Sequence, residues 1–371
     1  MTNRDKIQEE AISTILNYHR GTCAISMGVG KTLIGLMHMT IHYNGKNRFL
    51  VVAPKVSIFQ SWKEDAVKFN KAYLLDCIDF TTYLSINKKD PAKYSVVYLD
   101  ECHSLLYSHK YFLDNYKGKI LGLTGTPPVR DYSEKAKMVN HYCPVRYTYK
   151  VDQAVSDNIL NDYSIKVHML QLSKAKDFKV ALKTKGTFYT SEYENYNYCT
   201  TRVSTAQMGT QAYQFAVIAR MTAIKQYKTK EDYTANLLKS ITDKCIVFAN
   251  TQKQADKICK ASYHSKNPYS EKNLKKFKEG EINQLSCVDQ LSEGVTIPNL
   301  KAGIIMHSYG NERKTNQRLG RMLRLNPDMV SEIHILCYKD TVDEKWLNDA
   351  LSSIDPSKIE YIDTSKNLFN A

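Results

Sequence analysis

The 371-residue chain lacks several features that would place it in a particular class of protein. No apolar run reaches the ~20 residues that a membrane-spanning helix needs, and the N-terminus lacks the apolar core of a signal peptide. The nine cysteines form no C-x-x-C pair and follow no regular spacing, which argues against a zinc ribbon and a disulfide framework. These absences predict a soluble, cytoplasmic protein without membrane contact, whose cysteines are reduced and structural.

Acidic residues are fewer than basic ones, with 38 Asp and Glu against 52 Lys and Arg and a net charge of +14. This balance suits a phosphate-bearing partner, although charge alone does not distinguish DNA from RNA or an anionic membrane. A hydrophobic content of 43% leaves room for two or three domains with sizeable cores. The abundance of Lys, Asn and Tyr favours an AT-rich genome, such as that of a phage or other virus.

Short β-prone apolar runs alternate with helical patterns in two successive series, the first including 49–53 and the second starting at Cys245. Such alternation is typical of parallel sheets with crossover helices. The pattern therefore predicts an α/β protein with two lobes. The expected parts are an N-terminal lobe at 1–152, a C-terminal lobe at 153–350 and a short polar tail at 351–371.

A glycine-rich run in the first series has the composition of a phosphate-binding loop. It reads Met27-Gly28-Val29-Gly30-Lys31-Thr32 and lies between a β-prone run and a helical pattern. Backbone N–H groups at Gly28 and Gly30 can surround phosphates, where the helix N-terminus adds partial positive charge. Lys31 would reach the β- and γ-phosphates, and the Thr32 hydroxyl would ligate Mg²⁺. The run predicts a site for ATP and Mg²⁺.

An acidic motif ends the apolar run 96–99 and reads Asp100-Glu101-Cys102-His103. Asp100 is expected to hold Mg²⁺, and Glu101 to polarise the water that attacks the γ-phosphate. Either motif alone is common in unrelated proteins. Together, in this order, they predict a nucleotide-hydrolysing enzyme.

Five further runs occur in a fixed order along the chain. They are Val51–Lys55 with Gln60-Ser61-Trp62, Leu123-Thr124-Gly125-Thr126-Pro127, Cys245–Thr251, Gln290–Pro298 and the Q-x-x-G-R-x-x-R run Gln317–Arg324. In spelling and order, the chain resembles the superfamily-2 helicases and translocases, with a leaning toward the Snf2-like and phage recombination-helicase branches. The resemblance covers most of the chain. It implies two RecA-like, doubly wound parallel-sheet lobes with an ATP cleft between them.

The resemblance also assigns roles to residues outside the two nucleotide motifs. Arg321 and Arg324 lie three apart, on one face of an expected helix, and are the arginine-finger candidates of the second lobe. Gln317 joins them as a catalytic candidate, and Gly294 is a nucleotide-binding candidate, although Thr296 replaces the carboxylate usual in that motif. The residues expected to couple hydrolysis to nucleic-acid binding are His103, Thr124 and Thr126.

Gln8 is the candidate reader of the adenine base. It lies four residues after Arg4, one more than the family spacing, on a helix whose apolar face includes Ile12 and Ile15. Its amide can still be presented to the adenine edge. The alternative is a surface glutamine on an amphipathic helix.

The segment at about 173–240 is expected to be an insertion in the C-terminal lobe. Strand-like runs on either side of Lys185-Gly186 predict a hairpin, and a tyrosine cluster follows it. Bases stack on aromatic rings and lysines neutralise phosphates, so a nucleic-acid contact is one interpretation. An ordinary amphipathic insertion is the other. The nucleic-acid candidates are Lys55, Lys183, Lys185 and Tyr189.

These observations lead to one functional hypothesis with two alternatives. The chain is expected to be an ATP-dependent DNA helicase or translocase, a monomeric motor that acts on single-stranded, duplex or branched DNA in replication, recombination or repair. The preference for DNA over RNA rests on the resemblance alone. The alternatives are an RNA helicase and a nucleotide-gated nucleic-acid-binding clamp that does not unwind its substrate.

Overall fold

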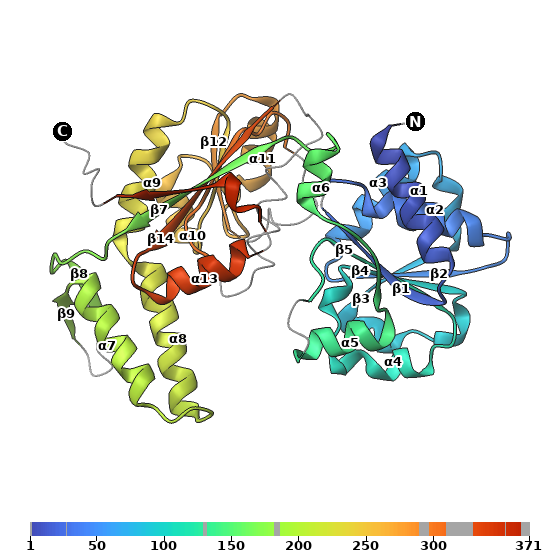
Figure 1. The fold of residues 1–371 in the computed structure, drawn as a ribbon, viewed down its shortest axis with the longest axis horizontal. Coiled ribbons are helices and arrows are strands. Elements are labelled where there is room, and N and C mark those ends of the chain that lie inside the picture. Colours follow the sequence, from blue (N-terminus) through green and yellow to red (C-terminus); the bar gives the residue numbers. More distant parts are fainter. Residues whose placement is uncertain are drawn as a thin grey trace. The chain divides into compact units, whose positions relative to one another are not determined.

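A computed structural model describes residues 2–26, 28–128, 132–181, 186–288, 297–308, 329–352 and 354–364. The chain divides into two compact units, one formed mainly by residues 1–162 and the other beginning at Tyr163. Each is an α/β unit with a central parallel sheet (Figure 1). The predicted fold class is confirmed.

The strands of the first unit run in the order β3-β2-β4-β5-β1-β6, and all their described pairings are parallel. They are β1 (Arg20–Ile25), β2 (Phe49–Ala53), β3 (Ile78–Thr82), β4 (Val96–Asp100), β5 (Lys119–Thr124) and β6 (Val145–Tyr149). β2 and β4 are buried along their whole length. Burial on both faces explains why their sequences are continuous apolar runs rather than alternating ones.

Helices cover both faces of this sheet, with α1, α2 and α3 on one side and α4 and α5 on the other (Figure 1). They are α1 (Asn3–Leu16), α2 (Lys31–His42), α3 (Ser57–Lys68), α4 (Lys110–Asn115) and α5 (Glu134–Tyr142). A capping box begins α1, where the Thr2 hydroxyl accepts the Asp5 N–H and the Asp5 carboxylate accepts the Thr2 N–H. Two N–H groups that the helix cannot satisfy internally are thereby paired.

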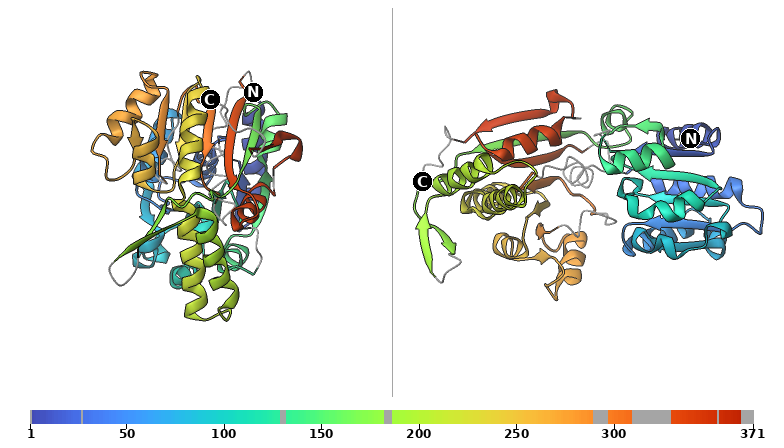
Figure 2. Two further views of the ribbon diagram at one scale, coloured as in Figure 1. Left: turned by 90° about the vertical axis from the view of Figure 1, so that its left-hand side faces the viewer. Right: turned by 90° about the horizontal axis from the view of Figure 1, so that it is seen from below.

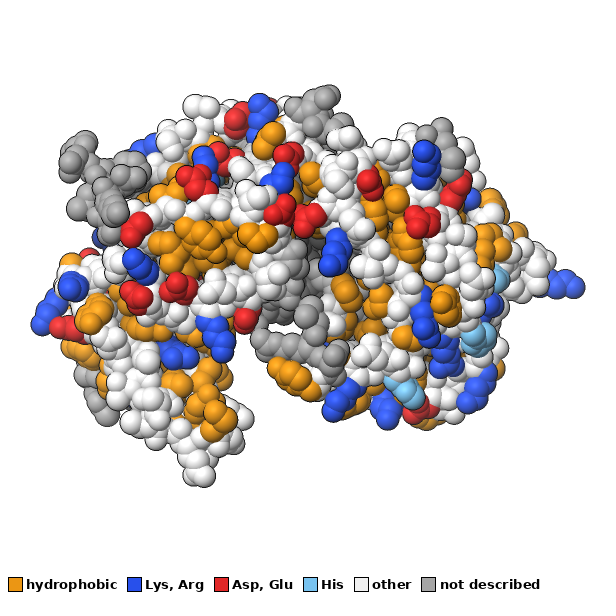
Figure 3. Space-filling view, viewed as in Figure 1, with side chains coloured by type: hydrophobic (Ala, Val, Ile, Leu, Met, Phe, Trp, Pro, Cys, Tyr) orange, Lys and Arg blue, Asp and Glu red, His pale blue; other side chains and the backbone are white. Residues whose placement is uncertain are grey.

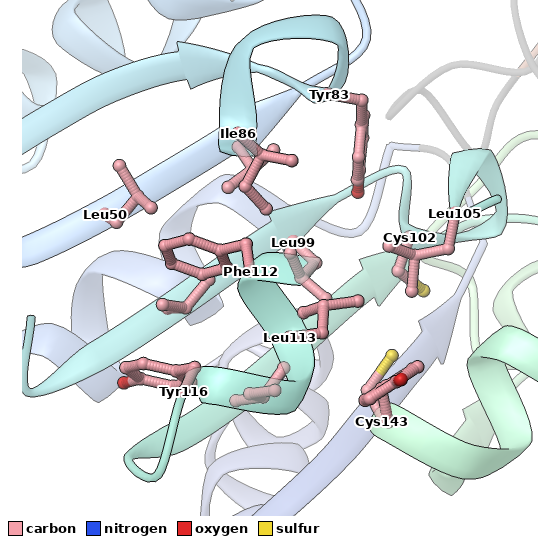
Figure 4. Close-up of a cluster of buried hydrophobic side chains, with 14 of the residues drawn as sticks. Leu50, Tyr83, Ile86, Leu99, Cys102, Leu105, Phe112, Leu113, Tyr116 and Cys143 are labelled. Atoms are coloured by element: carbon pink, nitrogen blue, oxygen red, sulfur yellow. The ribbon is translucent and has the colours of Figure 1, made fainter. Parts of the chain in front are cut away.

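The core under α4 joins this helix to the middle of the sheet. Figure 4 shows Leu50 of β2 and Leu99 of β4 facing Phe112 and Leu113 of α4. All four side chains are almost completely buried. Their burial holds β4 in place, and the acidic motif follows directly at the end of that strand.

The first unit ends at Asp162, later than the predicted residue 152. Helix α6 (Val151–Ser156) and the residues after it belong to this unit. The Asn3 side chain donates to the Asp157 carbonyl (2.9 Å), and the Tyr149 hydroxyl donates to the Asp157 carboxylate (2.6 Å). The contact between Asn3 and Asp157 joins residues far apart in sequence and ties the segment after α6 to the first unit.

The second unit has a sheet of order β11-β12-β10-β13-β14-β7-β15. Its strands are β7 (Tyr163–Leu170), β10 (Cys245–Phe248), β11 (Ser262–Tyr263), β12 (Gln284–Cys287), β13 (Ala302–Ile305), β14 (Ser331–Tyr338) and β15 (Ile359–Asp363). Strand β15 lies inside the segment 351–371 that was expected to be a polar tail, and it pairs in parallel with β7. Backbone hydrogen bonds hold this edge strand in the sheet. Its side chains are partly exposed, so its sequence lacks the run of apolar residues that predicts a buried strand.

The predicted insertion forms a helical arm and a hairpin. Strands β8 (Phe178–Ala181) and β9 (Thr187–Thr190) pair antiparallel, as predicted, around a connection that contains Lys183 and Lys185 and lies outside the described residues. Helices α7 (Glu192–Thr205) and α8 (Gln211–Gln226) lie side by side and extend away from the second sheet (Figures 1 and 2). Hydrophobic side chains lie on the surface of this arm (Figure 3).

The remaining helices of the second unit are α9 (Lys228–Ser240), α10 (Gln252–Ile258), α11 (Ser270–Glu279) and α13 (Val342–Leu351). Among the helices that the structure describes, none is long and apolar enough to cross a membrane. No disulfide joins any of the nine cysteines in the described part of the chain, and all but Cys77 are buried. Their burial agrees with the prediction of structural cysteines.

A buried ion pair joins α9 to α13 beneath β14. Lys230 is fully buried, and its ammonium donates to the Asp343 carboxylate (2.5 Å) and to the Leu336 carbonyl (2.8 Å). The same carboxylate accepts the Tyr338 N–H (3.0 Å). A buried charge that loses its partner keeps its desolvation cost, so both members are needed together.

Replacing Lys230 by Met should lower the free energy of unfolding by about 3–5 kcal/mol, because Asp343 would stay buried without its cation. The double variant Lys230→Met/Asp343→Leu should recover part of that loss, since neither charge remains. Urea denaturation of the two variants and the wild type measures both effects. A single variant as stable as the wild type would contradict this account of the pair.

Candidate active site

The candidate site lies where four parallel strands of the first unit end. The glycine-rich loop follows β1, Lys55 follows β2, Asp100 ends β4 and Thr124 ends β5. The carboxyl ends of parallel strands meet at one edge of a sheet, which is where α/β proteins bind ligands. The topology therefore brings together motifs that are separated by up to a hundred residues.

The loop after β1 adopts a conformation that only glycine adopts easily. Gly28 and Gly30 have φ values of 92° and 102°, and Gly30 is the N-cap of α2. A Cβ on Gly30 would lie 2.7 Å from Arg4 Nη2 and from Gln8 Nε2. Helix α2 begins at Lys31, so its free N–H groups lie at the phosphate loop as predicted.

Two side chains of α1 hold this loop through one carbonyl. Gln8 Nε2 and Arg4 Nε donate to the Val29 carbonyl oxygen, at 2.7 Å and 3.0 Å. Gln8 is 2% exposed, which excludes the alternative of a surface glutamine on this helix. Burial lowers the pKa of Arg4, partly offset by Asp5 and Asp65.

A cavity of about 420 Å³ opens beside these residues. Its wall includes the amide of Gln8 and the apolar side chains of Leu33, Phe69 and Ile159. The rest of the wall is polar, with the amides of Asn3 and Asn158, the charged Arg4 and Asp5, and Thr2. Apolar side chains beside amides suit a planar heterocyclic base, and the cavity adjoins the phosphate loop. Its position agrees with the expected role of Gln8, although the helix also uses this side chain to hold Val29.

Asp100 is buried at the end of β4, and both of its carboxylate oxygens accept hydrogen bonds. The Trp62 indole N–H donates to Oδ2 (2.8 Å), and the Glu101 N–H donates to Oδ1 (2.9 Å). Burial, and then the neighbouring Glu101 charge, raise the pKa of Asp100 to about 6, while Trp62 and Lys31 act in the opposite direction. A bound cation would stabilise the ionised form of this buried carboxylate.

Glu101 has the left-handed backbone conformation, with φ 50° and ψ 53°. Its Oε1 lies 3.7 Å from the Lys31 ammonium, and its Oε2 lies 3.4 Å from both His103 Nδ1 and the Thr124 hydroxyl. Non-glycine residues adopt this backbone rarely, and such outliers cluster at functional sites. Glu101 is thereby aimed at the phosphate-loop lysine.

The coupling candidates lie around the same carboxylate. His103 Nδ1 is 2.8 Å from the Thr124 hydroxyl, which in turn accepts the Thr126 N–H (3.1 Å). The Thr126 hydroxyl is buried and has no hydrogen-bond partner within the described part of the chain. His103, Thr124 and Thr126 therefore form a continuous chain of contacts from Glu101 into the loop after β5.

The residues fit Mg²⁺ of the kind that binds with a nucleotide. No group of three or more His, Cys, Asp or Glu side chains that could hold a metal occurs in the described residues. Mg²⁺ commonly takes one or two carboxylates and completes its shell with water and substrate phosphates, so a lone buried carboxylate suits it. Asp100 and the Thr32 hydroxyl are the candidate ligands.

One contact at this site was not anticipated from the sequence. The Trp62 indole N–H donates to Asp100. In the sequence, Trp62 belongs to Gln60-Ser61-Trp62, one of the runs on which the resemblance rests. The sequence did contain a hint of this contact. Trp62 is one of only two tryptophans, and it lies on an expected helix, three residues before the acidic Asp65.

Several predicted site residues cannot be placed. Gln317, Arg321, Arg324, Gly294, Lys183 and Lys185 lie outside the described residues. Among the nucleic-acid candidates, Lys55 is exposed after β2, and Tyr189 is 61% exposed on β9 in the other unit.

Comparison with known proteins identifies the group to which the chain belongs. Residues 2–129 match the family described as the res subunit of type III restriction enzymes, and residues 229–326 match the helicase conserved C-terminal domain. A DNA 3'-5' translocase, XPB2, from Sulfurisphaera tokodaii is 26% identical, over 86% of this chain and 80% of the relative. The chain is a superfamily-2 helicase or translocase. As a member of this superfamily it is an ATP hydrolase.

Solved structures agree on the fold of this superfamily-2 enzyme. The ATP-dependent Type ISP restriction-modification enzyme LlaBIII bound to DNA has a TM-score of 0.63 and 15% identity, over 98% of this chain. A putative HsdR subunit of a type I restriction enzyme from Vibrio vulnificus has a TM-score of 0.60 and 18% identity, over 97% of this chain. The chain spans only 31% of the first structure and 67% of the second.

Two substitutions separate nucleotide binding from hydrolysis. Lys31→Ala should abolish ATP binding, because the ammonium that faces the phosphates is lost. Glu101→Gln should leave ATP bound and reduce turnover by orders of magnitude, because an amide cannot accept the proton of the attacking water. Equilibrium binding of a fluorescent ATP analogue and steady-state phosphate release measure the two effects. Wild-type turnover in Glu101→Gln would show that another group activates the water.

Proposed function

We propose that this superfamily-2 enzyme is an ATP-dependent DNA translocase or helicase, which couples hydrolysis to movement along DNA or to its remodelling. One observation carries the motor part of this proposal. The carboxylate of Glu101 faces the phosphate-loop Lys31 on one side and the chain of His103 and Thr124 on the other. A carboxylate in that position can report the state of the γ-phosphate to a second element of the protein.

Each residue of the site then has a distinct role. Lys31 and the N–H groups at the start of α2 bind the phosphates, and Glu101 orients and deprotonates the attacking water. Bound Mg²⁺, held by Asp100 and Thr32, would neutralise charge on the β- and γ-phosphate oxygens. Gln8 and the cavity beside it would hold the adenine. Loss of the γ-phosphate would free Glu101 to rearrange with Thr124, and so would alter the loop after β5.

DNA is the proposed track for three reasons. The sequence relative is a DNA translocase, the net charge of this chain is +14, and Lys55 is exposed beside the phosphate site. A basic surface binds phosphates largely without regard to sequence. We propose that the enzyme acts as a monomer in the cytoplasm. The relative is archaeal, so the proposed phage or viral origin rests on composition alone.

The hairpin of β8 and β9 is a candidate second contact with DNA. Phe188 and Tyr189 are exposed on β9, at 45% and 61%, next to a connection with two lysines. Exposed rings can stack on bases, each by about 1–3 kcal/mol. Two rings of the neighbouring helix α7 lie close to cations. The Lys174 ammonium, from the segment before β8, lies 5.6 Å from the Tyr193 ring, and the Arg202 guanidinium lies 5.9 Å from the Tyr198 ring. These pairs keep positive charge close to exposed aromatic surface.

The arginine fingers are tested by separating turnover from stability. Arg321→Ala and Arg324→Ala should each lower kcat by roughly 10³-fold or more, because the guanidinium stabilises charge on the γ-phosphate in the transition state. ATP affinity and the melting temperature should change little. A variant that melts early, while its folded fraction hydrolyses ATP at the wild-type rate, would identify that arginine as structural.

The nature of the track is tested by ATPase assays without nucleic acid and with single-stranded DNA, duplex DNA, branched DNA or RNA. DNA should stimulate turnover more than RNA does, and its apparent affinity should fall steeply as salt rises. Lys183→Ala/Lys185→Ala should weaken DNA stimulation and spare the basal rate.

The matched control is Lys275→Ala/Lys278→Ala, which removes two lysines from α11 and should leave DNA stimulation unchanged. If DNA stimulates the ATPase activity of the hairpin variant and of the wild type equally at every DNA concentration, the hairpin does not contact DNA. Stronger stimulation by RNA would identify an RNA helicase. DNA binding gated by ATP without any hydrolysis would identify a clamp.

A further inference from the structure

Helix α3 contacts the candidate metal site through Trp62. The indole is fully buried, and its N–H donates to Asp100 Oδ2 at 2.8 Å. The ring packs edge-on against Tyr98, with centroids 6.3 Å apart. On its other side it meets α2, where a Cβ on Gly35 would lie 2.4 Å from the ring atom Cη2. The position of the N–H is therefore set on several sides by packing.

This contact restrains the orientation of the carboxylate. Asp100 Oδ1 accepts the Glu101 N–H, so Trp62 and the backbone bind one oxygen each. A carboxylate held at both oxygens has little freedom to rotate, yet each oxygen keeps lone-pair capacity for a cation. Partners of metal ligands that act in this way typically contribute 10–100-fold to metal affinity.

The same helix also packs against α2, which carries the second candidate ligand, Thr32. Asp65 lies one turn after Trp62 on α3. Burial raises the pKa of its carboxyl, while Lys68 and the Thr32 side chain act in the opposite direction. The contact between Trp62 and Asp100 does not follow from the roles that the superfamily motifs assign.

Helix α3 starts immediately after the exposed segment that borders the proposed DNA track. Lys55 is two residues before the first helical residue, Ser57, and Trp62 lies about 1.4 turns further along. A helix is stiff over this length, so a shift at its first turn moves Trp62 as well. A DNA contact at Lys55 would therefore change the surroundings of Asp100.

We propose that Trp62 is a positioning residue, which orients Asp100 for Mg²⁺, and that α3 connects the DNA track at Lys55 to the metal site. The inference rests on the proposed function, because it requires that Asp100 binds Mg²⁺ and that DNA contacts the protein at Lys55. It adds a route from DNA to the nucleotide that starts inside the first unit and passes through a tryptophan.

The first test is the Mg²⁺ dependence of turnover in Trp62→Phe, which keeps an aromatic ring and removes the N–H donor. The Mg²⁺ concentration for half-maximal ATPase should rise at least tenfold. Binding of a fluorescent ATP analogue in excess EDTA should stay within twofold of the wild type, as a purely structural defect would not allow. Trp346→Phe removes the other buried tryptophan, from the second unit, and should change neither quantity.

The second test is spectroscopic and leaves the site intact. In Trp346→Phe, Trp62 is the only tryptophan, so its emission reports directly on Asp100. Titration of Mg²⁺ in the presence of ADP should change this emission with saturation, and adding duplex DNA should shift it again. This measurement remains informative if Trp62→Phe fails to fold.

The outcomes separate the inference from the function on which it rests. A wild-type enzyme without ATPase activity at any Mg²⁺ concentration would overturn the proposed function. Two results with an active wild type would overturn the positioning role alone. One is a Trp62→Phe variant whose Mg²⁺ requirement is unchanged. The other is Trp62 emission, measured in Trp346→Phe, that does not change with Mg²⁺. Emission that responds to Mg²⁺ and not to DNA would overturn the connection through α3.

Discussion

Two adjacent carboxylates, buried at the end of β4, are the constraint on which the rest of the first unit depends. Asp100 is 7% exposed, and the Glu101 side chain is 13% exposed. Burying such groups is costly unless donors or cations surround them. The donors come from three elements, with Trp62 on α3, Lys31 on α2 and Thr124 on β5. A doubly wound parallel sheet meets this need because its strands deliver their ends to one edge.

The nucleotide-binding part of the unit is arranged around a single carbonyl. Arg4 and Gln8 both donate to Val29, so α1 and the phosphate loop are held as one body. Gly30 must lack a Cβ for these side chains to approach. The distance between the cavity that suits a base and the loop that suits phosphates is therefore fixed. Such an arrangement favours a single nucleotide over two separate ligands. In the proposed site, recognition of the base and of the phosphates would depend on the same contact.

The second unit contains an ion pair that is buried between two of its helices. Lys230 and Asp343 link a helix that follows the inserted arm to a helix near the end of the chain. The arm is anchored at the same place, because Glu192 accepts hydrogen bonds from the Thr229 N–H and hydroxyl. At its far end the arm exposes Met208 and Phe215. The arm is thus attached to the second unit at its base and exposes apolar residues at its far end.

The sequence by itself determined the fold class, the phosphate loop and the acidic motif, because these depend on local spacing and on periods of apolar residues. It also indicated the hairpin at 178–190, whose two strands are close in sequence. Only the tertiary structure decided that the first unit runs on to Asp162, that β15 pairs with β7, and that Trp62 reaches Asp100. Each of these depends on contacts between residues distant in the chain, and a hydrogen bond made across a sheet edge or between a helix and a strand leaves no periodic trace in either segment.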